Sequence, residues 1–261
     1  MAQPLFSIIL ASYNAEKTIE KSIQCVKAQN FRNFEFILID GGSNDRTLSI
    51  LQSYEDIIDV QISEPDKGIY DAWNKGLRYA KGEWILFIGA DDYLHKDALK
   101  AYSDFLGSCD VSHTYYISSK IRIISDRGDV KRIFGWPWDW HTFRKMHIVA
   151  HPGSIHRRTL FDNFGHYDIN FKIAGDYELL LRPKENLNAL FLNQITLDMT
   201  EGGVSSNLKT CLEARKAQLA NRVSPVLNIN IGYLFQLIKL AAKQFCTRLG
   251  INVYVRKEFT N

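Results

Sequence analysis

Carboxylate and amide side chains follow four apolar segments in the first hundred residues. The first segment ends in Ser12-Tyr13-Asn14, the second in Asp40, the third precedes Asp66-Lys67, and the fourth runs into Asp91-Asp92. Adjacent carboxylates suit a hard divalent ion, and Mg²⁺ or Mn²⁺ commonly bridges a protein carboxylate to substrate phosphates. Asp and Asn also favour ordinary turns, but four polar ends, one of them with two acids, favour a shared site.

The apolar segments themselves predict strands, and helical spacing lies between them. We expect strands at Phe6–Leu10, Phe34–Ile39, Val60–Ile62 and Trp84–Ile88, and helices at Thr18–Ala28 and Tyr70–Ala80. Strands that alternate with helices indicate an α/β fold with a mainly parallel sheet flanked by helices. Ligands of such sheets bind beyond the carboxyl ends of the strands, where the four polar ends lie.

The pattern changes after about residue 107. We expect a hairpin, a helix, two short strands and two C-terminal helices, at Tyr115–Ser125 with Val130–Phe134, Asp176–Leu181, Ala189–Leu192, Ile195–Met199, Asn207–Asn221 and Gly232–Leu249. The aromatic loop Trp136–Trp140 fits either a surface that stacks on a sugar or a packed core. The last two helices form a C-terminal helical appendage.

Charge is unevenly distributed along the 261 residues. The net charge of +3 is too small to indicate nucleic acid as a partner, but the segment from Glu201 onward holds nine Lys or Arg and three acids. A basic tail suits an anionic membrane or a phosphate-bearing substrate, and a solvated basic helix is an equal alternative. Four scattered cysteines, no secretory signal and no bilayer-spanning run predict a cytoplasmic protein, with a peripheral position at the inner face of the membrane as an option.

Two common nucleotide-binding motifs are missing from the sequence. No Gly-x-Gly-x-x-Gly follows the first predicted strand, and no Walker A motif is present. Phosphates are therefore expected on a metal ion rather than in a glycine-rich loop.

Four motifs in this order resemble the family 2 glycosyltransferases, which have a GT-A fold. They are Ser7-Ile8-Ile9-Leu10-Ala11-Ser12-Tyr13-Asn14, Ile39-Asp40-Gly41-Gly42-Ser43-Asn44-Asp45, Asp66-Lys67-Gly68-Ile69-Tyr70-Asp71-Ala72-Trp73-Asn74-Lys75-Gly76 and Gly89-Ala90-Asp91-Asp92. The resemblance is close over the first hundred residues and looser at His151-Pro152-Gly153, Gly175-Asp176 and Gly202–Ser205. It implies a GT-A domain over 1–206, with a nucleotide-binding half (1–107) and an acceptor half (108–206), followed by the helical appendage (207–261).

The resemblance also implies roles for single residues on the donor side. Asp40 would accept a uridine N–H, Ala11, Tyr13 and Asn14 would form the base and ribose wall, and Asp66 and Asn74 would belong to the donor site. Asp91 would sit beside the ribose and, with Asp92, hold Mn²⁺ or Mg²⁺. Lys67 would add positive charge near the phosphates unless it is an ordinary exposed lysine. Gly202, Gly203 and Ser205 would form either a loop that closes over the donor or a plain turn.

Asp176 resembles the catalytic base of the family, which takes the proton of an acceptor hydroxyl and gives inversion at the anomeric carbon. A helix-start acid that only favours the helix dipole is the alternative, and His151 would orient the acceptor or be structural. Three positions depart from the family pattern. Gly89 stands where many members have Asp, Trp73 where many have Arg, and Gly175 where Glu often precedes the base.

The resemblance therefore predicts a glycosyltransferase that moves a sugar from a nucleotide-diphosphate donor, UDP-sugar above all, to a glycan or lipid-linked acceptor in surface polysaccharide synthesis. A nucleotidyltransferase, a non-catalytic nucleotide-sugar-binding module and a metal-dependent hydrolase are the rival hypotheses. The apolar stripe around Leu234, Phe235 and Ile238 predicts a helix that packs on the body, forms a homodimer, or lies on an anionic membrane with Lys239, Lys243 and Arg248 toward headgroups.

Overall fold

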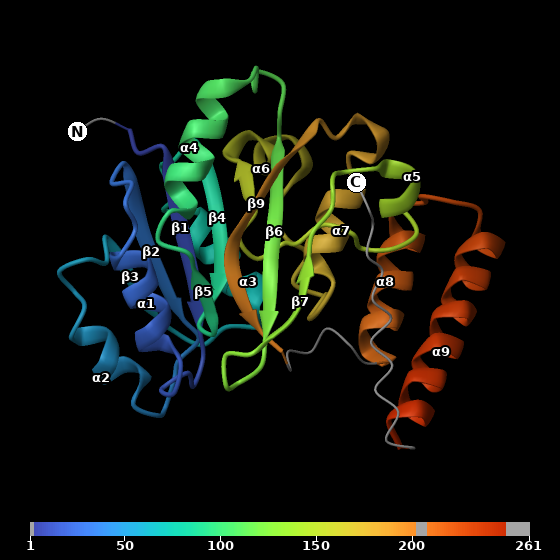
Figure 1. Ribbon diagram of the computed structural model, residues 1–261, viewed down its shortest axis with the longest axis horizontal. Coiled ribbons are helices and arrows are strands. Elements are labelled where there is room, and N and C mark those ends of the chain that lie inside the picture. Colours follow the sequence, from blue (N-terminus) through green and yellow to red (C-terminus); the bar gives the residue numbers. More distant parts are fainter. Residues whose placement is uncertain (1–2, 202–207, 249–261) are drawn as a thin grey trace.

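The computed structural model describes residues 3–201 and 208–248. Within them, nine strands form one sheet that helices cover on both faces (Figure 1). Eight strands follow the order β3 (Val60–Ser63), β2 (Phe34–Asp40), β1 (Phe6–Ser12), β4 (Trp84–Gly89), β8 (Ile155–Arg157), β6 (Tyr116–Ile124), β9 (Ala189–Thr200) and β5 (Asp92–Leu94), and β7 (Val130–Phe134) pairs with β6. The predicted α/β class is therefore confirmed.

The alternation of side chains along β1 explains the layers. Phe6, Ile8 and Leu10 belong to the core under α1 (Ile19–Lys27), α2 (Thr47–Gln52) and α4 (Ala98–Ser108). Ile9 and Ala11 point to the opposite face, in the core under α3 (Ile69–Leu77), α6 (Arg158–Phe164) and α7 (Gly175–Leu181). Successive residues of a strand face opposite sides, so each face of the sheet buries its own core.

Parallel pairing dominates only the first half of the sheet. Strands β3, β2, β1 and β4 pair in parallel, as predicted, and β6 pairs in parallel with β9. The pairs β4–β8, β6–β8, β6–β7 and β5–β9 are antiparallel. Because β5 from the first hundred residues pairs with β9, the predicted nucleotide and acceptor halves share one sheet.

Two strand predictions have different outcomes. The expected hairpin is present as β6 and β7. The two short strands predicted at Ala189–Leu192 and Ile195–Met199 are one strand, β9, because the pairing with β6 passes from Leu192 to Ile195 and leaves Asn193 and Gln194 out of register. A bulge of this kind interrupts the hydrophobic pattern without ending the strand.

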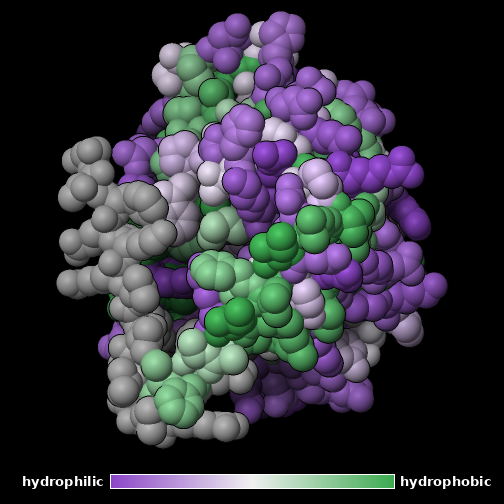
Figure 2. Space-filling view, turned by 90° about the vertical axis from the view of Figure 1, so that its right-hand side faces the viewer, coloured by the Kyte–Doolittle hydropathy of each residue, from purple (hydrophilic) through white to green (hydrophobic). Residues whose placement is uncertain are grey.

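The C-terminal appendage consists of α8 (Leu208–Ala220) and α9 (Val226–Arg248), which lie side by side at one edge of the molecule (Figure 1). Helix α9 begins six residues earlier than its predicted start at Gly232. A band of hydrophobic residues crosses the face that carries these helices (Figure 2). Among the described helices, none is long and apolar enough to cross a membrane.

The short helices α5 (Trp140–Phe143) and η1 (Lys184–Asn186) complete the described elements. Helix α5 begins inside the aromatic loop, where Trp136, Trp138 and Trp140 are partly buried against the core under α3. The Trp138 ring lies 4.3 Å from the ring of Phe143. Of the two interpretations of this loop, the structure favours packing.

Candidate functional site

A cleft of about 380 Å³ lies beyond the carboxyl ends of β1 and β4. The predicted residues Ala11, Tyr13, Asn14, Asp66 and Asp91 all line it. Strand β1 supplies Ala11, and the segment after it supplies Tyr13 and Asn14. The segment after β3 supplies Asp66, and the segment after β4 supplies Asp91. Three of the four polar strand ends predicted from the sequence thus converge on one cleft, where an open parallel sheet binds its ligands.

Asp91 and Asp92 direct their carboxylates to one place beside Gly89. A β-carbon built on Gly89 would lie 3.1 Å from Asp91 Oδ1 and 3.3 Å from Asp92 Oδ2. The Gly89 N–H donates to Asp92 Oδ2 at 2.7 Å, and the Ser22 hydroxyl donates to the carbonyls of Ala90 and Asp92. The backbone that carries both acids is therefore fixed on β4 and α1.

Burial and the neighbouring charge of Asp91 raise the pKa of Asp92 to about 7. Two converging carboxylates, one of them buried, are the kind of donor set that a hard divalent ion stabilises. The described residues hold no cluster of three or more metal-ligating side chains. The chemistry of these two carboxylates fits such an ion.

Asp40 lies behind the cleft rather than in it. Its side chain is fully buried, with Oδ1 accepting from the hydroxyls of Ser12 and Ser43 and Oδ2 from Ser63 and the N–H groups of Gly42 and Ser43. Burial alone would raise the pKa of Asp40, but these hydrogen bonds outweigh it and lower the pKa below its ordinary value. All its acceptor positions are occupied, so the predicted contact with a base N–H does not fit this arrangement, and Asp40 instead ties the ends of three strands together.

Asp66 is the carboxylate that lines the cleft beside an aromatic ring. A β-carbon on Gly41 would meet Asp66 Oδ2 at 2.5 Å and the ring of Tyr13 at 3.3 Å, so both side chains flank the same glycine. The Asp66 Oδ1 atom accepts the Gly68 N–H at 2.7 Å, and Tyr13 is 63% exposed. An exposed ring next to a fixed carboxylate offers a stacking surface and an N–H acceptor.

Three other residues that were predicted to bind the sugar donor differ in what they contact. Asn14, at a positive φ of 46°, accepts the N–H of Asn44 and so braces the loop after β2. Asn74 cannot face a donor, because both ends of its amide bind the backbone of Tyr167, at 2.8 and 3.0 Å. Lys67 is exposed on the segment before α3. Gly202, Gly203 and Ser205 lie outside the described residues.

Asp176 lies in the first turn of α7 and makes one hydrogen bond with a side chain. The Tyr70 hydroxyl donates to Asp176 Oδ1 at 3.0 Å. The other oxygen, Oδ2, is 3.9 Å from His147 Nε2, a buried nitrogen that has no hydrogen-bond partner among the described residues. Burial lowers the pKa of His147, and the nearby Asp176 charge partly offsets this. One oxygen of Asp176 is thus held in place while the other faces an imidazole across a gap.

The ring of Tyr70 occupies the space beside Gly175. A β-carbon there would come within 2.8 to 3.0 Å of the Tyr70 ring. The ring that positions Asp176 therefore leaves no room for a side chain at position 175. The absence of the family's Glu at this position follows from the same contact.

Two other groups in this part of the chain, Glu178 and His151, have side chains that could act as a base, but both are already engaged. Glu178 forms an ion pair with Arg182 and accepts a hydrogen bond from Asn221. His151 is buried, bonds the Tyr167 hydroxyl at 3.0 Å, and has its pKa lowered to about 3 by burial and by His147. Of Asp176, Glu178 and His151, Asp176 is the group with an oxygen atom that accepts no hydrogen bond among the described residues.

Two structural links connect the Asp176 region to the rest of the molecule. Helix α3 places Ile69 and Ala72 in the cleft while its Tyr70 binds Asp176. From α8, the Glu213 carboxylate accepts the N–H groups of three consecutive residues just before α7: Lys172, Ile173 and Ala174. Sequence reasoning missed Tyr70, His147 and Glu213. Tyr70 stands inside a quoted motif, but no local pattern marks His147 or Glu213.

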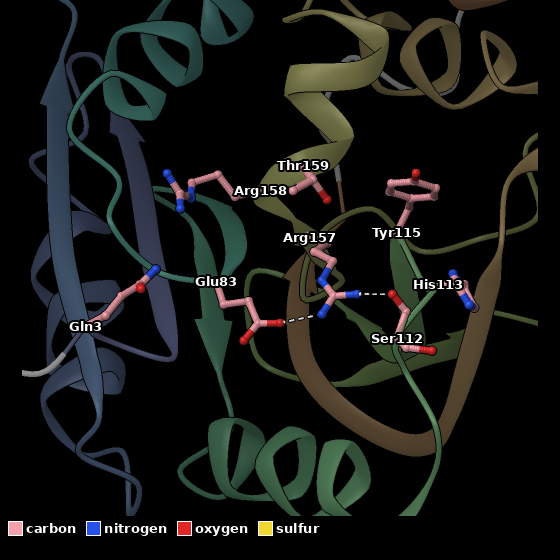
Figure 3. Close-up of a pocket in the computed structure, with 8 residues that line it drawn as sticks. All are labelled: Gln3, Glu83, Ser112, His113, Tyr115, Arg157, Arg158 and Thr159. Atoms are coloured by element: carbon pink, nitrogen blue, oxygen red, sulfur yellow. Dashed lines mark hydrogen bonds and ion pairs between the residues drawn. The ribbon is translucent and has the colours of Figure 1, made fainter.

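A second hollow, of about 460 Å³, lies at the opposite end of the sheet, where β4 begins (Figure 3). The guanidinium of Arg157 points to Glu83 at 2.6 Å and donates to the carbonyls of Val111 and Ser112. This arginine thus holds three chain segments together. The cleft at the carboxyl ends of the strands gathers carboxylates that form no ion pair with an arginine among the described residues. It is therefore the better candidate for chemistry.

Comparison with known proteins identifies the family of this chain. The sequence profile of Glycosyl transferase family 2 matches residues 7–159. The chain is 29% identical over 213 residues to a PGL/p-HBAD biosynthesis glycosyltransferase of Mycobacterium bovis, covering 79% of this chain and 81% of the relative. It is 28% identical over 193 residues to the poly(ribitol-phosphate) β-N-acetylglucosaminyltransferase TarS of Staphylococcus aureus, covering 71% of this chain and 33% of TarS.

Solved structures share the fold at low sequence identity. The structure of S. aureus TarS residues 1–349 in complex with UDP-GlcNAc superposes with a TM-score of 0.68 and 20% identity, over 95% of this chain and 76% of that one. A mannosyltransferase of Pyrobaculum calidifontis in complex with GDP-Man and Mn²⁺ gives a TM-score of 0.64 at 16% identity, over 95% and 76% of the two chains. The GT-A fold is thus confirmed. The chain belongs to glycosyl transferase family 2 and is a nucleotide-sugar-dependent glycosyltransferase.

Proposed function

We propose that this glycosyltransferase takes its sugar from a UDP-sugar and transfers it, with inversion, to a hydroxyl of a glycan or lipid-linked acceptor. The observation that carries the proposal is the position of α3. It lines the donor cleft with Ile69 and Ala72 and fixes Asp176 through Tyr70. One rigid helix therefore sets the distance between the bound donor and the base, as a positioned bimolecular reaction requires.

The donor base would lie against Tyr13, with its N–H toward Asp66 in place of the predicted Asp40. The stacking ring and the carboxylate both line the cleft and flank Gly41. A uracil imide N–H needs an acceptor, and a carboxylate is acceptor-only. Relatives of known structure bind UDP-GlcNAc in one case and GDP-Man in another, which supports a nucleotide-sugar site and leaves the base to be tested.

The diphosphate would lie over Asp91 and Asp92, which would hold Mn²⁺ or Mg²⁺. The ion supplies charge stabilisation for the departing UDP. The mannosyltransferase structure contains Mn²⁺, and the two converging carboxylates of this chain fit the same kind of ion.

The transfer step is a single displacement. The acceptor oxygen attacks the anomeric carbon while Asp176 Oδ2 takes its proton, and the bond from that carbon to the diphosphate breaks with UDP as the leaving group. The Tyr70 hydroxyl holds Oδ1, so Oδ2 is the free oxygen of this carboxylate. His147 Nε2 lies 3.9 Å from this oxygen.

A panel of nucleotide-sugars tests the proposal. Each donor is incubated with Mn²⁺ and the melting temperature is recorded, because a ligand of the native state stabilises it by mass action. We expect UDP-sugars to raise the melting temperature and GDP-sugars to have no effect. Stabilisation by GDP-sugars alone would contradict the proposed base, and transfer with retention, read by NMR of the product anomer, would contradict the single displacement.

A further inference from the structure

Helix α9 carries apolar side chains on two sides. Ile229 is buried against the rest of the appendage at 4% exposure. The opposite side carries the outer stripe, which we define as Leu227, Ile231, Leu234, Phe235, Ile238 and Phe245. Its members are spaced by one, three, four or seven residues, which places them on one side of a helix, and they are 57% to 70% exposed. Figure 2 shows a hydrophobic band on the side of the molecule that carries α8 and α9. A stripe of this size on a helix marks an interaction surface.

The surroundings of the outer stripe are positively charged. From Leu208 to Arg248 the chain has seven Lys or Arg and one acid, Glu213. The Glu213 carboxylate is engaged by the backbone N–H groups before α7. Lys239 lies beside the stripe, with its ammonium 4.5 Å from the centre of the Phe235 ring. An apolar stripe with basic and no acidic neighbours on its helix complements a surface that is apolar inside and anionic outside.

We propose that the outer stripe of α9 docks on the surface of an anionic lipid bilayer. The helix lies in the plane of the interface, and Lys239 reaches the headgroups. It does not cross the bilayer, because Asn228, Asn230, Gln236 and Lys239 interrupt the apolar run and no described helix meets the requirement for a span. This inference does not depend on the proposed donor or acceptor.

A second copy of the chain fits the stripe less well. Two-fold pairing would place the same surface of both copies together. Each copy would bring the positive charges of its α8–α9 pair, and α9 has no acidic side chain to offset them. Like charges at such an interface oppose association, whereas anionic headgroups favour it.

Docking would also orient the catalytic side of the molecule. Through Glu213, α8 holds Lys172, Ile173 and Ala174, which lead directly into the α7 turn that carries Asp176. A membrane-bound α9 would therefore fix the Asp176 region relative to the bilayer, which suits an acceptor presented from a membrane.

Co-sedimentation of the full chain with lipid vesicles tests the proposal. We expect binding to vesicles that contain phosphatidylglycerol, much weaker binding to phosphatidylcholine alone, and a decrease with added salt. The triple variant Ile231→Asn/Leu234→Asn/Ile238→Asn should bind at least about tenfold less, and Lys239→Glu several-fold less. Val130→Asn/Ile133→Asn on β7, whose residues are 52% and 51% exposed, is the matched control and should bind like the wild type.

Circular dichroism and the melting temperature show that each variant is folded. Equal binding of the wild type and the triple variant to anionic vesicles would overturn the proposal. So would the absence of vesicle binding together with a dimer, detected by light scattering, that the triple variant dissociates. In that case the outer stripe is the interface with a second copy.

Discussion

The donor cleft and the Asp176 region are built in different ways. The cleft gathers residues that directly follow neighbouring parallel strands, so each side chain is placed by its own strand end. The Asp176 region brings together Tyr70, His147 and Asp176 from three distant segments, with Glu213 on α8 bracing the loop before α7. The first region depends on local order in one sheet, and the second on packing across the whole domain.

This difference separates two kinds of function. In the proposed mechanism, the strand ends would supply fixed polar groups for a nucleotide and an ion, and the packed region would supply a base whose position depends on several supports. Changes in the cleft should therefore alter affinity for the donor, while changes around Asp176 should alter the rate of transfer. The predictions below test this division, from the largest expected effect to the smallest.

Asp176→Asn should cause the largest loss. Asn keeps the shape and the hydrogen bond from Tyr70 but cannot take a proton, and a positioned base contributes about 10²–10⁴-fold to rate. We expect transfer to fall by that factor while UDP-sugar affinity, measured by titration calorimetry, stays at the wild-type value. Glu178→Gln is a matched carboxylate control on the same helix, read for transfer once its melting temperature shows that it is folded. Wild-type transfer by Asp176→Asn would assign the residue to the helix cap only.

Asp92→Ala should remove the metal-dependent part of UDP binding. The two carboxylates beside Gly89 are the proposed ligands, so the loss should be on the order of 10- to 100-fold in Kd with Mn²⁺ present. In chelator, the variant and the wild type should bind UDP alike. If the wild type binds UDP equally well with Mn²⁺ and with chelator, the metal role is wrong.

Glu213→Gln and Tyr70→Phe should slow transfer by about tenfold each, through positioning. Each removes a charged or polar hydrogen bond of the kind that contributes about 1–3 kcal/mol, and neither residue lines the donor cleft. We therefore expect kcat to fall while Kd for UDP is unchanged. A change in donor Kd with kcat intact would show that the two regions are not divided as described.

Substitutions at Asp40 and Asp66 should have different effects, the first on the stability of the fold and the second on UDP binding. Asp66→Ala should weaken UDP binding by about tenfold and leave the melting temperature near the wild-type value. Asp40→Asn should lower the free energy of unfolding by about 1–3 kcal/mol, because its new amide N–H₂ faces N–H and hydroxyl donors. A folded Asp40→Asn variant that loses only UDP affinity would restore the predicted role of Asp40 as the base acceptor.

The lowered pKa of Asp40 also predicts how the free energy of unfolding changes as the pH falls. A carboxyl with a depressed folded pKa contributes stability above the ordinary value of 3.8, and that contribution is lost as the pH falls toward the folded value. Urea unfolding at several pH values should show a shallower acid decline for Asp40→Asn than for the wild type.

The sequence predicted the donor side better than the catalytic side. Strand periodicity located β1 to β4, and parallel topology alone implied that Tyr13, Asp66 and Asp91 would meet. The sequence could not show that Asp40 is buried, because an Asp in such a turn can either bind a ligand or accept hydrogen bonds from nearby serines. The pairing of Tyr70 with Asp176 spans 106 residues, and no local pattern encodes a contact of that separation.

The most direct test of the account is a crystal structure with UDP and Mn²⁺, with data collected at the manganese edge. We predict an anomalous peak between the carboxylates of Asp91 and Asp92, the uracil ring against Tyr13 with its N–H toward Asp66, and the β-phosphate on the side of the cleft that α3 shares with Asp176. A peak elsewhere, or UDP bound in the hollow beside Arg157 at the other end of the sheet, would contradict it.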